Sequence, residues 1–151
     1  MGITATYNKR EFNKGLNKDL DKLIDDAINL FFNLGKRAVD IAFSDGNYIN
    51  RTGVLRSSIG CGVSYNGVTK KVYGFMPVNG SNEGVREGRE FLDSVLKQNV
   101  RRNEVKLVVV AGAEHASYVE DNSKYIVIEN AKDFVEANVG SILKQLKVIT
   151  I

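Results

Sequence analysis

The chain has 151 residues, a length typical of one domain with a substantial hydrophobic core. Its hydrophobic (43%) and charged (26%) fractions are ordinary for a globular protein, and a formal net charge of +3 is too small to indicate a nucleic-acid partner by itself. A single cysteine, Cys61, excludes an internal disulfide, and no apolar run reaches the length of a membrane span. These features predict a soluble intracellular domain.

The segment from about Asn8 to Ser44 carries apolar residues at helical spacing, with charged residues on the opposite side. This periodicity predicts a long amphipathic helix. The later half of the segment has a second apolar row, which consists of Ile28, Phe32, Val39 and Phe43. A helix that is apolar on two sides needs two surfaces to pack against. The second row therefore packs either within this chain or against another subunit, and the sequence leaves both alternatives open.

The next segment, RTGVLRSSIGCGV, combines a short helical turn with the start of a strand. Thr52 is suited to cap the turn through its hydroxyl group, and the turn ends near Ser57. From Ile59 to Tyr65, apolar residues alternate with glycine or serine, which predicts a strand with one apolar face and one nearly bare face. Because glycine weakens a strand, the bare face indicates that another backbone or a helix lies very close to it.

The Asn66-Gly67 pair that follows is the strongest short hairpin signal in the chain. Residues from Val68 to Phe75 form the expected returning strand. Met76 to Gly84 contains the only proline and is expected to be a loop. The apolar spacing in REFLDSVLKQN then predicts a helix, inserted within residues 84–99.

The residues from Val105 to Ala111 form an almost uninterrupted apolar run, which is typical of a central strand covered on both faces. Residues 125–128 are ambiguous between a strand and the start of the last helix. Asn130 is predicted to cap that helix, with Asp133 in its first turn. The expected fold is α+β, a single domain of residues 1–151 in which a long N-terminal helix and a C-terminal helix pack on a small antiparallel β-sheet. Such a sheet has exposed edges unless partners cover them.

Residues that carry catalytic chemistry are scarce. His115 is the only histidine, and Cys61 alternates in phase with apolar neighbours, which favours a buried packing role. The adjacent carboxylates of Asp25-Asp26 and of Glu120-Asp121 point apart in a helix or strand, so neither pair is arranged for acid–base work. GSNEGVREG (residues 80–88) is similar to a phosphate-binding loop but lacks its Gly-Lys-Ser/Thr ending, and a mobile loop is predicted instead. We therefore expect no enzyme, cofactor or metal site, although an enzyme that uses His115 with a nearby carboxylate is a third alternative.

Three basic pairs, Lys9-Arg10, Lys70-Lys71 and Arg101-Arg102, lie far apart in the chain and are interrupted by acidic residues. Their distribution favours ordinary solvated surface. The alternative function that they support is a nucleic-acid-binding module, in which these pairs neutralise phosphates.

Two segments resemble those of a known family. RTGVLRSSI resembles the Thr-Gly-x-Leu-Arg-x-Ser-Ile element that follows the long first helix in the tail-completion (head–tail joining, neck) proteins of long-tailed bacteriophages. VVVAGAEHASYVED (residues 108–121) is similar to the Tyr-Ala-x-Tyr-Val-Glu segment that precedes the last helix of that family. This chain departs from the pattern at Asp121-Asn122-Ser123, where the family usually continues Phe-Gly-Thr, and in the additional helical stretch of residues 84–99.

The resemblance implies a structural virion protein, assembled in the cytoplasm of a bacterial host, that forms a homo-oligomeric ring between the head connector and the tail. Connector and tail proteins are then its partners, and a weak contact with DNA is compatible with that position. Ring assembly joins one patch of a subunit to a different patch of the next. Within this hypothesis, the expected interface residues are Phe32, Val39, Phe43, Arg51, Arg56, His115, Tyr118 and Glu120.

Overall fold

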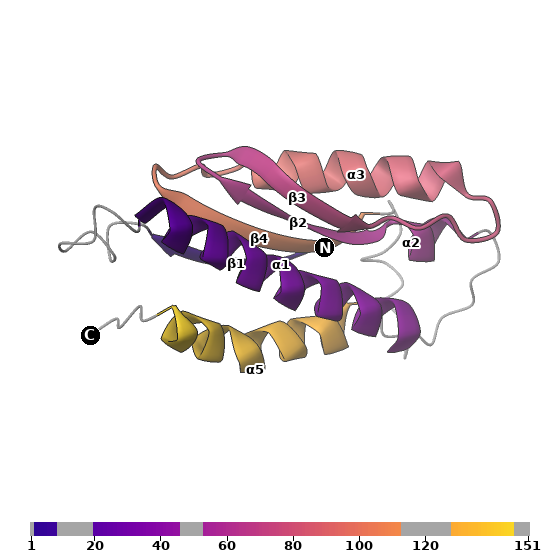
Figure 1. Ribbon diagram of the computed structural model, residues 1–151. Helices are drawn as coiled ribbons and strands as arrows, with labels where there is room; N and C mark the ends of the chain where they lie inside the picture. The colour runs from indigo at the N-terminus through magenta and orange to yellow at the C-terminus, as the bar shows by residue number, and fades with distance from the viewer. Residues whose placement is uncertain (1, 9–19, 46–52, 113–127, 147–151) are drawn as a thin grey trace.

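The computed structural model describes residues 2–8, 20–45, 53–112 and 128–146 (Figure 1). The described residues confirm the predicted α+β fold, with a long N-terminal helix, a C-terminal helix and a four-stranded antiparallel sheet in the order β1-β4-β2-β3. The elements are β1 (Gly2–Asn8), α1 (Leu20–Asp45), α2 (Val54–Ser57), β2 (Ile59–Tyr65), β3 (Val68–Gly74), α3 (Asn82–Leu96), β4 (Glu104–Ala111) and α5 (Glu129–Gln145).

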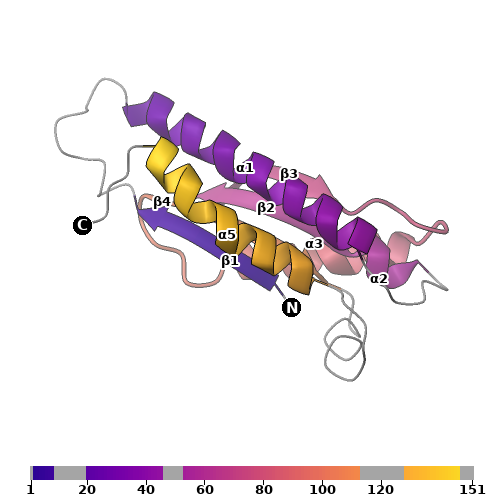
Figure 2. The same ribbon diagram turned by 90° about the horizontal axis from the view of Figure 1, so that it is seen from below.

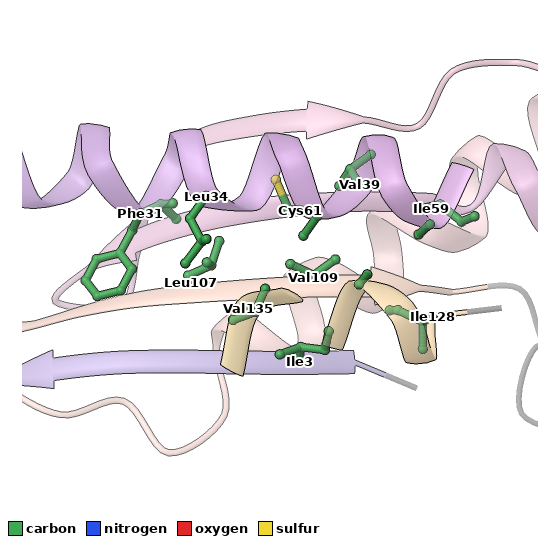
Figure 3. Packing of buried hydrophobic residues seen from close by; sticks show 14 of the residues in the cluster. Ile3, Phe31, Leu34, Val39, Ile59, Cys61, Leu107, Val109, Ile128 and Val135 are labelled. Carbon is green, nitrogen blue, oxygen red and sulfur yellow. The ribbon is translucent and has the colours of Figure 1, made fainter. Parts of the chain in front are cut away.

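Helices cover both faces of the sheet. α1 and α5 pack side by side on one face, and α3 packs on the other (Figures 1 and 2). The larger core lies between the sheet and the α1/α5 layer, where side chains from β1, β2, β4, α1, α2 and α5 meet (Figure 3 shows part of it). A smaller cluster under α3 consists of Phe75, Leu92, Leu96, Val108 and Val110. β4 contributes to both clusters and is buried along its whole length, as predicted for a central strand.

Part of the second apolar row of α1 packs within this chain. Ile28 and Val39 are buried in the protein's own core, whereas Phe32 and Phe43 are half-buried. The helix comes close to the sheet at Gly35, where an added Cβ atom would lie 2.7 Å from Leu107 Cδ1 and 2.9 Å from Cys61 Sγ. α1 begins at Leu20 in the described residues, and the earlier part of the predicted helix, residues 9–19, lies outside them.

β1 is the strand that the sequence pattern did not reveal. It pairs with β4 over its whole length, from Gly2 opposite Val110 to Asn8 opposite Glu104. This pairing makes β4 central, because β2 occupies the other side of the same strand. β1 and β3 are therefore the two edges of the sheet.

The hairpin and the bare face of β2 are both confirmed. Asn66 (φ 54°) and Gly67 (φ 79°) form the two-residue turn between β2 and β3, with the positive φ angles that a type I′ turn requires. On the bare face, the Phe75 ring covers Gly60, and a Cβ atom on Gly62 would lie 3.0 Å from Leu92 Cδ2. The missing side chains thus let α3 and Phe75 approach the backbone of β2.

Gly53 and Ser57, in the described part of RTGVLRSSI, lie in a crowded junction with Val78. Gly53, not Thr52, occupies the N-cap position of α2, with φ at 75° and the Val78 carbonyl so close that a side chain has no room. The predicted cap by Thr52 is therefore wrong for this position, and Thr52 itself lies outside the described residues. Ser57 Oγ accepts a hydrogen bond from the Val78 N–H (2.7 Å), which ties α2 to the loop before α3.

α3 begins earlier than predicted. Ser81 caps it by accepting a hydrogen bond from the Gly84 N–H (3.3 Å), so residues 82–88 belong to the helix. The mobile loop predicted for residues 80–88 is therefore wrong from Asn82 on, and α3 begins two residues before the predicted helical stretch of residues 84–99. At the C-terminal end of α3, the Lys106 ammonium group donates hydrogen bonds to the carbonyls of Val95 (3.2 Å) and Gln98 (2.7 Å). A cation at this position also opposes the negative end of the helix dipole.

α5 begins at Glu129, and Ile128 rather than Asn130 occupies its N-cap position. Ile128 is buried in the core, and this packing fixes where the helix begins. The acidic residue of the first turn is Glu129. The predictions that Asn130 is the cap and that Asp133 lies in the first turn are therefore both wrong. The ambiguous residues 125–127 lie outside the described part of the chain.

Candidate interaction surface

Four of the eight predicted interface residues, Arg51, His115, Tyr118 and Glu120, lie outside the described residues. The other four lie on α1 and α2, and they differ in how far they are buried. Val39 is fully buried (0% exposed), so it is a core residue and offers no surface to a neighbour. Phe32, Phe43 and Arg56 are half-buried and reach the surface.

Phe43 and Arg56 contact each other. The guanidinium carbon of Arg56 lies 5.5 Å from the centroid of the Phe43 ring, within the range of a cation–π interaction. The contact joins the C-terminal part of α1 to α2. Glu120, the carboxylate predicted to pair with Arg56, is outside the described residues.

The Phe32 ring contacts two cations. Lys36 Nζ is 5.1 Å and Lys71 Nζ is 5.2 Å from the centroid of its ring. One ammonium comes from the next turn of α1 and the other from β3, so the ring joins the helix to the sheet edge. Among the described residues, neither lysine forms an ion pair, and the ion pairs found there, Arg86–Glu90 and Lys97–Asp93, both lie on or at the end of α3.

Asp40 and Tyr73 extend this group along the same side of β3. The Tyr73 hydroxyl donates a hydrogen bond to Asp40 Oδ1 at 2.8 Å. This bond holds the proton on the phenol and raises the pKa of Tyr73, with smaller contributions from burial and from the Asp40 charge. We call the five side chains the edge cluster: Phe32, Lys36, Asp40, Lys71 and Tyr73. Only Phe32 among them was predicted as an interface residue, and Lys71 belongs to one of the predicted basic pairs, although the i, i+4, i+8 spacing of the three α1 members is visible in the sequence.

The edge strand β3 is the most exposed strand whose side chains the structure describes. Within the described chain it pairs with β2 alone, so its outer side carries unpaired backbone groups. Val68 is 57% exposed and Val72 is 39% exposed. The register shifts between Val63 and Ser64 and leaves Lys70 as an extra residue in β3. A bulge of this kind increases the local twist of an edge strand.

The structure brings two of the three basic pairs toward the same end of the molecule. The hairpin turn contacts the loop between α3 and β4, where the Asn103 N–H donates to Asn66 Oδ1 and Val100 lies against Gly67. Lys70-Lys71 and Arg101-Arg102 flank this contact. The remaining pair, Lys9-Arg10, lies outside the described residues.

Cys61 has the packing role that its sequence position indicates. Its side chain lies in the core between α1 and the sheet (Figure 3), and burial raises the pKa of the thiol to about 12. A thiol in this state is a poor nucleophile near neutral pH.

No described helix has the length and apolarity needed to cross a bilayer. Within the described ranges, no three side chains of metal-binding type are grouped as ligands. No family model, curated protein or solved structure matches this chain.

Proposed function

We propose that the protein is a tail-completion (neck) subunit of a long-tailed bacteriophage, a structural protein that forms a ring between the head connector and the tail. The observation that supports this most strongly is the order of elements around the RTGVLRSSI segment. α1 precedes it, and the β2–β3 hairpin, the central strand β4 and the last helix α5 follow it. This is the order that the resemblance implies.

The surface of the subunit is compatible with assembly. A ring requires each subunit to offer two different patches, one for each neighbour. The half-buried Phe43–Arg56 contact is a candidate for one such patch, and the β3 edge, with its exposed valines, is a candidate for contact with a different virion protein.

Deletion of the gene tests the proposal directly. In the virus or prophage that carries the gene, loss of a neck subunit leaves DNA-filled heads and finished tails that do not join. Electron microscopy of lysates distinguishes these separate parts from complete particles, and a plasmid copy of the gene is expected to restore joining. Complete, infectious particles without the protein, or a gene that lies outside any cluster of viral structural genes, contradict the proposal.

Nucleic-acid binding is the second candidate, and the structure favours it at one point. The hairpin contact gathers two basic pairs that the sequence separates by about thirty residues. If these four cations bind phosphates, log Kd for duplex DNA is expected to rise with log salt with a slope of about 3 to 4, since each phosphate contact contributes about 0.9. A slope near zero excludes this function for the hairpin end.

A further inference from the structure

We infer that the free edge of β3 binds an extended acidic segment of another protein, which adds to the sheet as one more strand. The inference rests on the proposed function, in which the donor of that segment is a neighbouring virion protein. Strand addition uses unpaired backbone groups for affinity and the side chains on both sides of the edge for specificity. β3, an edge strand of the sheet (Figure 1), provides both on either side of its bulge at Lys70.

The α1 side of the edge selects for carboxylates. Lys71 and Tyr73 point to this side, as their contacts with Phe32 and Asp40 show. Two ammonium groups, those of Lys36 and Lys71, converge on one ring without a carboxylate partner in the described chain. The only carboxylate of the edge cluster, Asp40, is bonded to Tyr73 near the end of the strand. An aspartate or glutamate of an added strand is therefore favoured beside Lys71.

The α3 side of the edge selects for apolar side chains. Val72 alternates with Lys71 and Tyr73, so it points to the opposite side, where its partner Gly62 lies under Leu92 and Leu96. With 39% of its surface exposed, Val72 has room for an apolar neighbour on the next strand. The preferred segment consequently alternates acidic and apolar residues.

Neither edge strand of a second copy meets these requirements. Pairing of β3 with another β3 brings Lys70 and Lys71 against like charges, which is destabilising. The other edge strand, β1, has the sequence GITATYN and carries no carboxylate. Lysines on an edge strand guard against aggregation, and here the same charges favour an acidic partner over the edge strand of a second copy.

The test uses the full chain and a blocked peptide of about eight residues that alternates glutamate and valine. Its controls are a lysine–valine peptide and a glutamate–valine peptide with alternate backbone amides methylated. We expect the first peptide to bind and to slow amide hydrogen exchange in Val68–Gly74. Methylation is expected to weaken binding about tenfold or more, because it removes main-chain donors. Equal binding of all three peptides, or no change of exchange in β3, overturns the inference.

Two charge reversals locate the site. Lys71→Glu is expected to weaken binding of the glutamate–valine peptide about tenfold or more. Lys132→Glu makes the same change of net charge on an exposed residue of α5, which packs against α1 and β1 rather than at the β3 edge, and is expected to leave binding unchanged. The inference is overturned if both variants have equal effects, or if the chain self-associates and Lys71→Glu abolishes that association. It is also overturned if a DNA duplex binds at this edge in place of the peptide.

The two proposals fail separately. A peptide that does not bind, together with unjoined heads and tails in the gene deletion, removes the β3 assignment and leaves the neck function. A peptide that binds as expected, together with normal particles in the deletion, removes the neck function and leaves the edge as a binding site for an acidic segment.

Discussion

Replacing Gly88 with alanine places a methyl group where α3 meets the start of β2. The added Cβ atom would lie 2.6 Å from the Ser58 carbonyl oxygen and 2.7 Å from Cδ1 of Phe75. Both distances are well below van der Waals contact, and the carbonyl oxygen belongs to the backbone. Overpacking of this kind costs about 1–3 kcal/mol, whereas alanine gains about 1 kcal/mol of helix propensity over glycine. The net expectation is a stability loss of up to about 2 kcal/mol.

Gly140→Ala is the matched control. Gly140 also lies inside a helix, α5, but a Cβ atom there would meet nothing within 4 Å. This variant is therefore expected to gain the full helix propensity, about 1 kcal/mol. Subtracting the change in the free energy of unfolding of one variant from that of the other cancels the helix propensity. The difference is the overpacking cost, about 1–3 kcal/mol.

Urea denaturation followed by far-ultraviolet circular dichroism measures both free energies of unfolding. We expect Gly140→Ala to have a higher midpoint than the parent chain and Gly88→Ala to have a lower one. If Gly88→Ala is as stable as Gly140→Ala, then α3 does not approach the sheet as closely as the structure shows. The close contact of α3 with Ser58 and Phe75 is then refuted.

Two further substitutions test buried polar groups. Because burial raises the pKa of the Cys61 thiol from 9.0 to about 12, folding favours the neutral thiol, and the protein is expected to lose stability as the pH rises from about 9 toward 12. Urea titrations at several pH values should show a smaller loss for Cys61→Ala, and identical pH dependence contradicts the assignment. Lys106→Met removes the donor to the Val95 and Gln98 carbonyls and is expected to cost about 1–3 kcal/mol, and an unchanged denaturation midpoint contradicts a capping role.

Local chemistry made several elements predictable. The Asn66-Gly67 turn has a specific backbone requirement, and the structure confirms it with two positive φ angles. The bare face of β2 required something close to it, and α3 and Phe75 provide the contact at Gly60 and Gly62. In both cases the residues themselves limit the conformations available, so the prediction did not depend on distant parts of the chain.

Features that depend on distant contacts were not predictable. β1 is held by its pairing with β4, about a hundred residues later in the chain, and its own sequence has only a weak alternation. The start of α5 is set by the burial of Ile128, which outweighs the capping preference of Asn130. The double-sided character of α1 was visible, but only the structure shows that Val39 belongs to the core.

The edge cluster was partly predictable, because each half of it follows a local spacing in the sequence. Phe32, Lys36 and Asp40 share one side of α1, and Lys71 and Tyr73 share one side of β3, so each half could be read from its own spacing. Their meeting depends on the packing of α1 against the sheet. The sequence alone provides no register for that packing.

The pairing of β1 with β4 also affects how the chain is made. Gly2–Asn8 leaves the ribosome before the strand that completes its hydrogen bonds, Glu104–Ala111, which follows about a hundred residues later in the chain. Until then the amide and carbonyl groups of β1 are satisfied by water or by a chaperone. Closure of the sheet is thus a late event of high contact order, and a shortened nascent chain that ends before Glu104 lacks the partner of its first strand.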